Sequence, residues 1–179
     1  MKSITLITGG ARSGKSSFAL DLARKNYDRR VFIATAVAFD EEMKRRIVQH
    51  QKDRGDLFHT LEEPVRLTET LSAVPEGTEV ALVDCLTVWL GNLYHHFRQN
   101  EAAVRSHVDE FLKAIPQVPC DLILVTNEVG WGIVPDNPLA RSFRDVAGYL
   151  NRKAAEEAKS VYLLCCGIAL EIKGGSVHG

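Results

Sequence analysis

The sequence has few cysteines, and their spacing suits neither a disulfide scaffold nor a zinc site. The four cysteines, Cys85, Cys120, Cys165 and Cys166, form no C-x-x-C pair. Long apolar runs are also missing, because the longest largely apolar stretch, from Val161 to Leu170, covers about half of the roughly 20 residues that span a bilayer. We therefore expect a soluble, non-secreted, cytoplasmic protein with reduced thiols and no stable membrane insertion.

An excess of charge of one sign is absent as well. The chain carries 22 lysines and arginines against 23 aspartates and glutamates, for a formal net charge of -1. No field of the whole protein draws it toward nucleic acid or an anionic membrane, so we expect no nucleic-acid partner and only a local anion site. The 179 residues, 45% of them hydrophobic, contain no repeat or flexible linker, which predicts a single globular domain over 1–179.

Short apolar runs alternate with longer segments that have helical character. The runs lack polar alternation, which is typical of a parallel sheet covered on both faces. Five such strands are predicted: Ile4–Thr8, Val31–Ala36, Val80–Asp84, Leu122–Thr126 and Val161–Cys166. The helices predicted between them are Lys15–Lys25, Asp40–Arg54, Pro64–Leu71, Cys85–Phe97, Glu101–Ile115 and Leu139–Lys159. This alternation predicts an α/β fold.

The most specific local motif is a glycine-rich loop between the first predicted strand and helix. Residues Gly9–Ser16 fit G-x-x-x-x-G-K-[ST], in which glycines let backbone N–H groups curl around a phosphate. Lys15 adds a cation for the β and γ phosphates, and Ser16 is a ligand for Mg²⁺. A plain turn without ligand does not explain a Lys-Ser pair directly after the last glycine, so the sequence predicts nucleotide binding.

A carboxylate ends the third predicted strand, and two roles are open for it. Asp84 stands where P-loop enzymes hold the metal, directly or through water. Asp is also a strong helix N-cap, here for the segment that begins at Cys85. The two roles are compatible.

The predicted helix over Asp40–Arg54 carries a histidine between two arginines. Arg46 and Arg54 lie four residues on either side of His50, so all three share one helical face. Such neighbours disfavour protonation and leave a neutral nitrogen nucleophile, while the guanidiniums suit phosphate oxygens. From spacing alone, a solvated surface histidine remains the favoured interpretation.

A second distinctive segment, Asn127–Pro135, follows the fourth strand and is too glycine-rich for a helix. We interpret it as an active-site loop, because a doubly wound sheet binds ligands where strands end. Trp131 is either a binding platform or a packing anchor. Downstream, Arg141 and Arg144 either meet phosphate or belong to a solvated basic face.

Together these motifs resemble the adenosylcobinamide kinase/adenosylcobinamide-phosphate guanylyltransferase family, a bifunctional P-loop enzyme of cobalamin nucleotide-loop assembly. The resemblance runs almost end to end. It rests on Thr8–Ser16, Ala34–Ala36, Glu42-Met43 with Arg46-Ile47 and His50, Thr60–Pro64, Val83–Thr87, Asn127–Pro135 and Arg141–Asn151. Arg152 departs from the family's usual Gln, and Val88–Pro119 has no recognisable signature.

The resemblance implies two reactions. First, a nucleoside triphosphate gives its γ phosphate to the aminopropanol hydroxyl of adenosylcobinamide. Then His50 attacks the α phosphorus of GTP, pyrophosphate leaves, and GMP passes from His50 to adenosylcobinamide phosphate to give adenosylcobinamide-GDP. His50 and Lys15 are accordingly the expected catalytic residues.

The resemblance also implies a fold, a cofactor and an assembly. It implies a RecA-like P-loop NTPase sheet, a homotrimer, Mg²⁺ on Ser16 and Asp84, and GTP or ATP as phosphate donor. The implied nucleotide contacts are Gly9, Gly10, Ala11, Arg12, Ser13, Gly14, Lys15, Ser16, Ala34, Thr35, Ala36, Gln51, Lys52, Asp53, Arg54, Glu62 and Asp84.

Two other functions are compatible with parts of the sequence. One is a P-loop small-molecule kinase without a covalent intermediate, in which His50 only contacts substrate. The other is a nucleotide-dependent switch, although the sequence lacks an N-K-x-D guanine motif. Glu128 and Asp145 are candidate bases on chemical type alone.

Overall fold

The fold is described from a computed structural model covering residues 2–38 and 41–174, excluding the side chains at positions 42, 43, 46, 49, 50 and 53. The strands are β1 (Ile4–Gly9), β2 (Arg30–Ala34), β3 (His59–Glu62), β4 (Val80–Asp84), β5 (Asp121–Val125), β6 (Ser160–Cys165) and β7 (Ile168–Lys173). The helices are α1 (Lys15–Asn26), α2 (Glu41–Arg54), α3 (Leu67–Ser72), α4 (Leu86–His96), α5 (Glu101–Ala114) and α6 (Pro138–Glu157), with short 3₁₀ turns η1 (Gly55–Leu57) and η2 (Ile115–Gln117).

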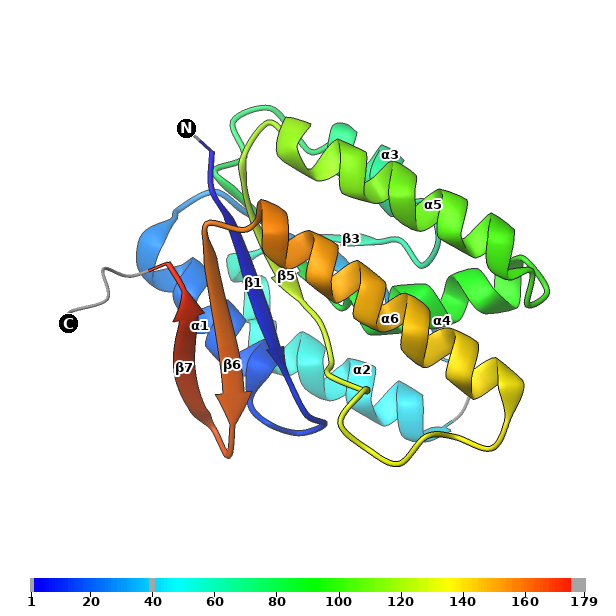
Figure 1. The fold of residues 1–179 in the computed structure, drawn as a ribbon. Helices are drawn as coiled ribbons and strands as arrows, with labels where there is room; N and C mark the ends of the chain where they lie inside the picture. The colour runs from blue at the N-terminus through cyan, green and yellow to red at the C-terminus, as the bar shows by residue number, and fades with distance from the viewer. Residues whose placement is uncertain (1, 39–40, 175–179) are drawn as a thin grey trace.

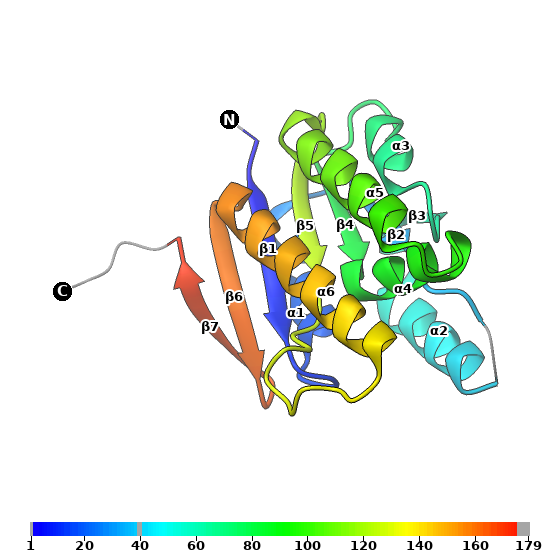
Figure 2. The same ribbon diagram turned by 45° about the vertical axis from the view of Figure 1, so that its right-hand side comes forward.

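The strands form one mostly parallel sheet in the order β3-β2-β4-β5-β1-β6-β7. Only β7 runs antiparallel to its neighbour among the pairings of the described residues. Figures 1 and 2 show that β1 and β6 end at the same edge of the sheet, where the loop before α1 also lies. The carboxyl ends of the parallel strands therefore converge on the glycine-rich loop.

Both faces of the sheet are covered, as continuous apolar strands require. Helices α3, α4, α5 and α6 bury one face, where Trp89 and Phe111 pack with ring centroids 4.9 Å apart. Helix α1 covers the other face through Ala19, Leu20 and Ala23. Helix α2 stands at the carboxyl edge of the sheet (Figure 1), and its last residue, Arg54, meets the α1 layer, because Arg54 O accepts from Arg24 Nη2 at 3.1 Å.

All five predicted strands are present, but two further strands were not expected. Strand β3 has four residues in a half-exposed, partly polar edge position, too short for a clear pattern. Strand β7 follows a tight turn in which Cys166 and Gly167 have positive φ, so the apolar run from Val161 to Leu170 is a hairpin rather than one element. The prediction that β2 continues to Ala36 was also wrong, since it ends at Ala34.

The predicted helices are present with shifted ends. Helix α3 begins at Leu67 rather than Pro64, and α6 begins at Pro138, where the Asn137 side chain accepts from the N–H groups of Leu139 and Ala140. The second predicted helix was expected to start at Asp40, which lies outside the described residues.

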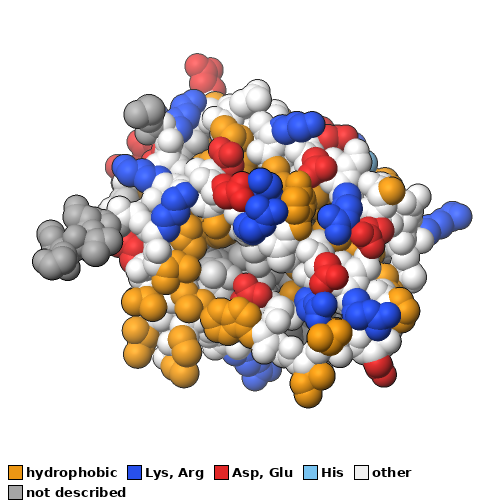
Figure 3. All heavy atoms as spheres, in the orientation of Figure 1, with side chains coloured by type: hydrophobic (Ala, Val, Ile, Leu, Met, Phe, Trp, Pro, Cys, Tyr) orange, Lys and Arg blue, Asp and Glu red, His pale blue; other side chains and the backbone are white. Residues whose placement is uncertain are grey.

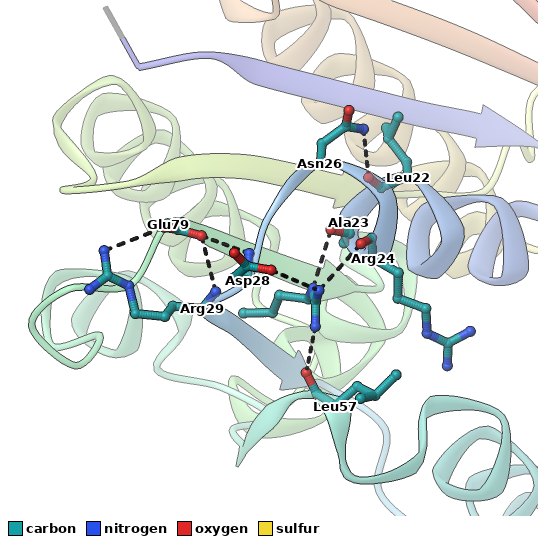
Figure 4. Close-up of polar contacts among 9 residues, drawn as sticks. Leu22, Ala23, Arg24, Asn26, Asp28, Arg29, Leu57 and Glu79 are labelled. Atoms are coloured by element: carbon teal, nitrogen blue, oxygen red, sulfur yellow. Dashed lines mark hydrogen bonds and ion pairs between the residues drawn. The ribbon is translucent and has the colours of Figure 1, made fainter.

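Polar contacts close the opposite, amino edge of the sheet. Glu79 accepts backbone N–H bonds from Asp28 at 2.7 Å and from Arg29 at 3.0 Å (Figure 4). An open hollow of about 560 Å³ lies beside them, lined in part by Lys2, Lys25 and Asp121. Within the described ranges, none of the helices combines the length and apolar character needed to cross a bilayer.

Candidate nucleotide site

A cavity of about 910 Å³ lies at the carboxyl edge of the sheet and joins segments far apart in sequence. The P-loop forms one wall, and the ends of β2, β4 and β5 and part of α2 form the others. Twelve expected nucleotide contacts line it: Ala11, Arg12, Ser13, Gly14, Lys15, Ser16, Ala34, Ala36, Gln51, Arg54, Glu62 and Asp84. The sheet order brings β2 here although β4 and β5 separate it from β1.

The P-loop needs its glycines for conformation and for space. Gly9 has φ 149°, and a Cβ there would clash with the carbonyl oxygen of Leu164. Gly14 has φ 94° and directly precedes α1, so the N-terminal amides of that helix border the cavity. The loop is held from both sides, because Gly9 O accepts from Glu128 N at 3.0 Å and Ser13 O accepts from Gly167 N at 3.1 Å.

Lys15 is a buried cation at the cavity wall. Its side chain is 7% exposed, and its ammonium donates to the carbonyl of Gly10 and to Ser13 Oγ. Burial lowers the pKa of Lys15, while the nearby Cys85 and the Asp84 carboxylate act in the opposite direction. An anion in the cavity would offset this desolvation, which is the role expected of a phosphate.

Asp84 ends β4 and faces the cavity without capping the next helix. Helix α4 begins at Leu86, and its N-cap is Cys85, whose thiol accepts from Val88 N at 3.5 Å. The N-cap interpretation of Asp84 was therefore wrong. Ser16 lines the same cavity, so a hydroxyl and a carboxylate, both oxygen donors of the type Mg²⁺ prefers, share one site.

Cys85 is beside this carboxylate but unsuited to nucleophilic chemistry. Burial, followed by the charge of Asp84, raises the pKa of Cys85 to about 12. The thiol is therefore protonated at neutral pH, and a thiol is a far weaker nucleophile than a thiolate.

The carboxyl end of α2 supplies a second buried cation. Arg54 is 7% exposed and its guanidinium lies 4.3 Å from the centroid of the Phe32 ring. Burial lowers the pKa of Arg54, against the charges of Glu62 and Asp84. Gln51 lines the cavity one helical turn earlier.

Some expected contacts fall elsewhere or outside the described side chains. Lys52 is exposed, and it does not line the cavity, nor do Gly9 and Gly10. The backbone of His50 and Asp53 belongs to α2, but their side chains lie outside the described residues.

Thr35 stands between two lining residues yet points into the protein. Its hydroxyl accepts from Cys85 N at 2.8 Å and donates to Cys85 O at 2.9 Å. The Asn92 amide donates to the carbonyls of Thr35 and Pro64 at 2.7 and 3.0 Å. These bonds hold the β2 and β4 ends in register with each other, so Thr35 positions the cavity wall.

Asn127 is a lining residue that the sequence reasoning placed in an active-site loop but did not assign to the nucleotide. Thr87 Oγ1 accepts from Asn127 N at 2.7 Å, and the Asn151 amide donates to Asn127 O at 3.1 Å. Its position after an apolar strand was the available signal. Nothing in the sequence indicated that apolar residues such as Phe32, Val88 and Val125 line the cavity, because their pattern is that of residues in a hydrophobic core.

The basic residues of α6 are occupied by their own loop and helix. Arg141 Nη1 donates to the carbonyls of Pro135 and Asp136, and Arg144 pairs with Asp145 at 2.9 Å. Neither lines the cavity. Trp131 is 77% exposed, so the packing-anchor interpretation was wrong for this chain.

The RecA-like P-loop fold is shared with solved structures. The chain superposes on the RadB recombinase with a TM-score of 0.52 at 15% identity, covering 90% of this chain and 73% of that one. A Pyrococcus horikoshii protein gives 0.56 at 9% identity, covering 98% and 88%. At these identities the likeness concerns the fold alone.

Sequence comparisons reach further. The family described as cobinamide kinase / cobinamide phosphate guanyltransferase matches residues 5–172. A Pseudomonas aeruginosa protein named bifunctional adenosylcobalamin biosynthesis protein CobP is 40% identical over 169 residues, 94% of this chain and 96% of that protein. The Escherichia coli protein named bifunctional adenosylcobalamin biosynthesis protein CobU is 37% identical over 179 residues, 94% and 98% of the two chains. With the P-loop, the Asp84 carboxylate and the end of α2 around one cavity, and matches over nearly its whole length, the chain belongs to the cobinamide kinase / cobinamide phosphate guanyltransferase family.

Proposed function

We propose that this chain, acting as a single domain over 1–179, catalyses both reactions of its family at the carboxyl-edge cavity. It phosphorylates adenosylcobinamide and then transfers GMP from GTP to adenosylcobinamide phosphate. The observation that carries the proposal is the meeting of the P-loop and the α2 residues Gln51 and Arg54 around one cavity. One nucleotide site can therefore serve both γ-phosphate transfer and GMP transfer.

The nucleotide binds with its triphosphate along the P-loop. The proposed contacts remain those expected from the resemblance, namely Gly9–Ser16, Ala34–Ala36, Gln51–Arg54, Glu62 and Asp84. Glu62 suits the N–H groups of a guanine edge, and the desolvated Lys15 and Arg54 suit phosphate oxygens. The donor in the kinase step is GTP or ATP.

In the kinase step the γ phosphorus passes to the aminopropanol hydroxyl. The new bond joins the hydroxyl oxygen to the γ phosphorus, the bond from that phosphorus to the bridging β-γ oxygen breaks, and the hydroxyl proton is released. Lys15 and the N-terminal amides of α1 stabilise the charge that moves onto the phosphate oxygens. Ser16 and Asp84 would hold Mg²⁺, which neutralises phosphate charge when bound.

In the guanylyl step His50 acts as the nucleophile. A neutral ring nitrogen forms a bond to the α phosphorus of GTP while pyrophosphate leaves, and a phosphate oxygen of the acceptor then displaces the histidine. The proposal is supported by the place of residue 50 in α2, directly before Gln51 and four residues before Arg54, both of which line the cavity.

The test is covalent labelling. The protein is incubated with Mg²⁺ and GTP labelled at the α phosphorus, and acid-labile, alkali-stable label is expected on the wild type and none on His50→Asn. His59→Asn, an exposed histidine on β3, is the matched control and should label fully. Undiminished label on His50→Asn sinks the nucleophile assignment, and γ-phosphate transfer without any α label favours a plain kinase.

We also propose that the protein is a cytoplasmic homotrimer. Ile168, Leu170 and Ile172 stand exposed on one face of β7, and Figure 3 shows apolar side chains gathered over the β6-β7 hairpin. Such a patch is typical of a subunit contact. Light scattering should give three times the 19.9 kDa chain mass for the wild type and a smaller mass for Leu170→Lys, with Leu57→Lys as the exposed control. A wild-type monomer would contradict the trimer.

A further inference from the structure

The loop that follows β5 presents an apolar surface beside the cavity. We call residues Val129–Val134 the Trp131 loop. Trp131 is 77% and Ile133 96% exposed, and Val129 and Val134 are exposed as well. An exposed tryptophan and isoleucine on one short loop are costly to leave in water and are typical of a contact surface.

The Trp131 loop carries no ionisable side chain. Glu128, directly before it, accepts from Gly130 N at 3.0 Å and so folds back on the loop. Gly132 is exposed and presents its backbone between the apolar side chains, whereas the Gly130 N–H is already bonded to Glu128. The surface therefore suits a large molecule whose periphery carries apolar groups and amides, and not a phosphate or a nucleic acid.

The loop starts at the wall of the nucleotide cavity. Asn127 lines that cavity, and Glu128 N donates to Gly9 O at 3.0 Å. Four residues of extended chain span at most about 14 Å, so the Cα of Trp131 lies within that distance of the Cα of Asn127. Figures 1 and 2 both show the loop between β5 and α6 beside the P-loop.

We propose that the Trp131 loop is the docking surface for the corrin ring of the acceptor, a deepening that rests on the proposed function. The corrin ring of the acceptor is a large macrocycle bearing methyl groups and amide side chains, and the acceptor hydroxyl must reach the γ phosphate on the P-loop. Trp131 and Ile133 cover the methyl-bearing periphery, the exposed Gly132 backbone meets an amide side chain, and the aminopropanol arm enters the cavity past Asn127.

The first test separates acceptor binding from nucleotide binding. In steady-state kinase assays Trp131→Ala and Ile133→Ala should raise KM for cobinamide about 10- to 30-fold, the cost of losing an aromatic or apolar anchor. KM for the nucleotide and labelling by α-labelled GTP without acceptor should stay within twofold. Trp131→Phe should recover most of the affinity, and Leu57→Ala, an exposed apolar residue elsewhere, should match the wild type.

The second test is direct. The chain has two tryptophans, and Trp89 is 1% exposed. Cobinamide absorption overlaps tryptophan emission, so titration of cobinamide should quench the exposed Trp131, and most of this quenching should be lost in Trp131→Phe.

The outcomes distinguish the two proposals. An unchanged KM for cobinamide in both alanine variants, or equal quenching in Trp131→Phe, overturns the docking surface while leaving the reactions intact. A change of molecular mass in Trp131→Ala also overturns it, because the loop is then a contact between copies. If the wild type transfers no phosphate to cobinamide, the proposed function fails, and the fluorescence titration still decides where the ring binds.

Discussion

The two edges of the sheet each carry a hollow with charged residues in its wall, but the charged groups are satisfied differently at the two edges. At the amino edge, carboxylates and donors satisfy one another: Glu79 accepts from two backbone N–H groups, and Asp121 accepts from Tyr27 Oη at 2.8 Å and Ser3 N at 2.7 Å. At the carboxyl edge, Lys15 and Arg54 are buried cations whose pKa values are lowered by desolvation.

Whether the charged groups of a hollow are already satisfied distinguishes a structural hollow from a binding site better than the volume of the hollow does. The hydrogen bonds at the amino edge hold the starts of the strands together. Because the carboxylates there already have donors, a ligand would add few new hydrogen bonds. At the carboxyl edge the fold bears a desolvation cost that an anion would relieve, and such perturbed groups cluster at functional sites. The contrast can be tested by changing equivalent groups at the two edges.

The largest expected effect is on catalysis. Lys15→Ala should lower kcat for γ-phosphate transfer by about 10²- to 10³-fold, since it removes a cation that stabilises transferring charge. Lys25→Ala, which removes an exposed lysine beside the amino-edge hollow, should leave kcat unchanged. Steady-state kinetics with thermal melts as a folding check would measure both. An equal loss of kcat in the two variants would contradict the view that only the carboxyl edge is a catalytic site.

The next effect is on stability and concerns the P-loop backbone. Gly9→Ala should lower the free energy of unfolding by about 3 kcal/mol, because φ 149° is unfavourable for alanine and its Cβ would meet Leu164 O. Gly10→Ala is the matched control, with no heavy atom within 4 Å of the added Cβ, and should change it by less than about 0.5 kcal/mol. Urea unfolding would compare them, and similar losses would contradict the close approach at Gly9.

A smaller effect is expected at Thr35. Thr35→Val should cost about 2 kcal/mol, because the buried N–H and C=O of Cys85 lose their hydroxyl partner. Thr78→Val, at the amino edge, loses an exposed bond to Pro75 O and should cost less than about 1 kcal/mol. If Thr35 positions the cavity wall, its variant should also raise KM for the nucleotide while Thr78→Val does not.

The smallest effect is a pH dependence of opposite sign at the two edges. Burial and the bond to Asp121 raise the pKa of Tyr27 to about 12, so its contribution is present below pH 10 and lost between pH 10 and 12. Lys15 has a lowered pKa, so the cost of its burial is relieved as pH rises through that value toward 10.5. Urea unfolding between pH 8 and 11 should show the Tyr27 loss vanish in Tyr27→Phe and the Lys15 gain vanish in Lys15→Met. If the free energy of unfolding kept the same pH dependence in these variants, its assignment to Tyr27 and Lys15 would be contradicted.

The parts of the site that sequence could predict are those with a specific chemical pattern. Gly9–Ser16 combines glycines, a lysine and a serine at fixed spacing, and Asp84 ends an apolar strand. The later part of this loop, Ala11–Ser16, and Asp84 line the cavity as expected, whereas Gly9 and Gly10 do not. The edge strands β3 and β7 were missed because a short or half-exposed strand has weak periodicity. The resemblance pointed to Thr35 only as a nucleotide contact, and Asn92 carries no pattern at all, since the bonds of both side chains reach segments more than 25 residues away.

By itself the sequence determined the α/β class, the phosphate loop and the family, because these follow from local periodicity and from residue types at fixed spacing. Only the tertiary structure decided that β4 and β5 lie between β2 and β1, that Thr35 turns inward, that Cys85 rather than Asp84 caps α4, and that Trp131 faces solvent. The physical reason is that strand order, burial and long-range hydrogen bonds depend on which surfaces meet when the whole chain packs, and no short stretch of residues contains that information.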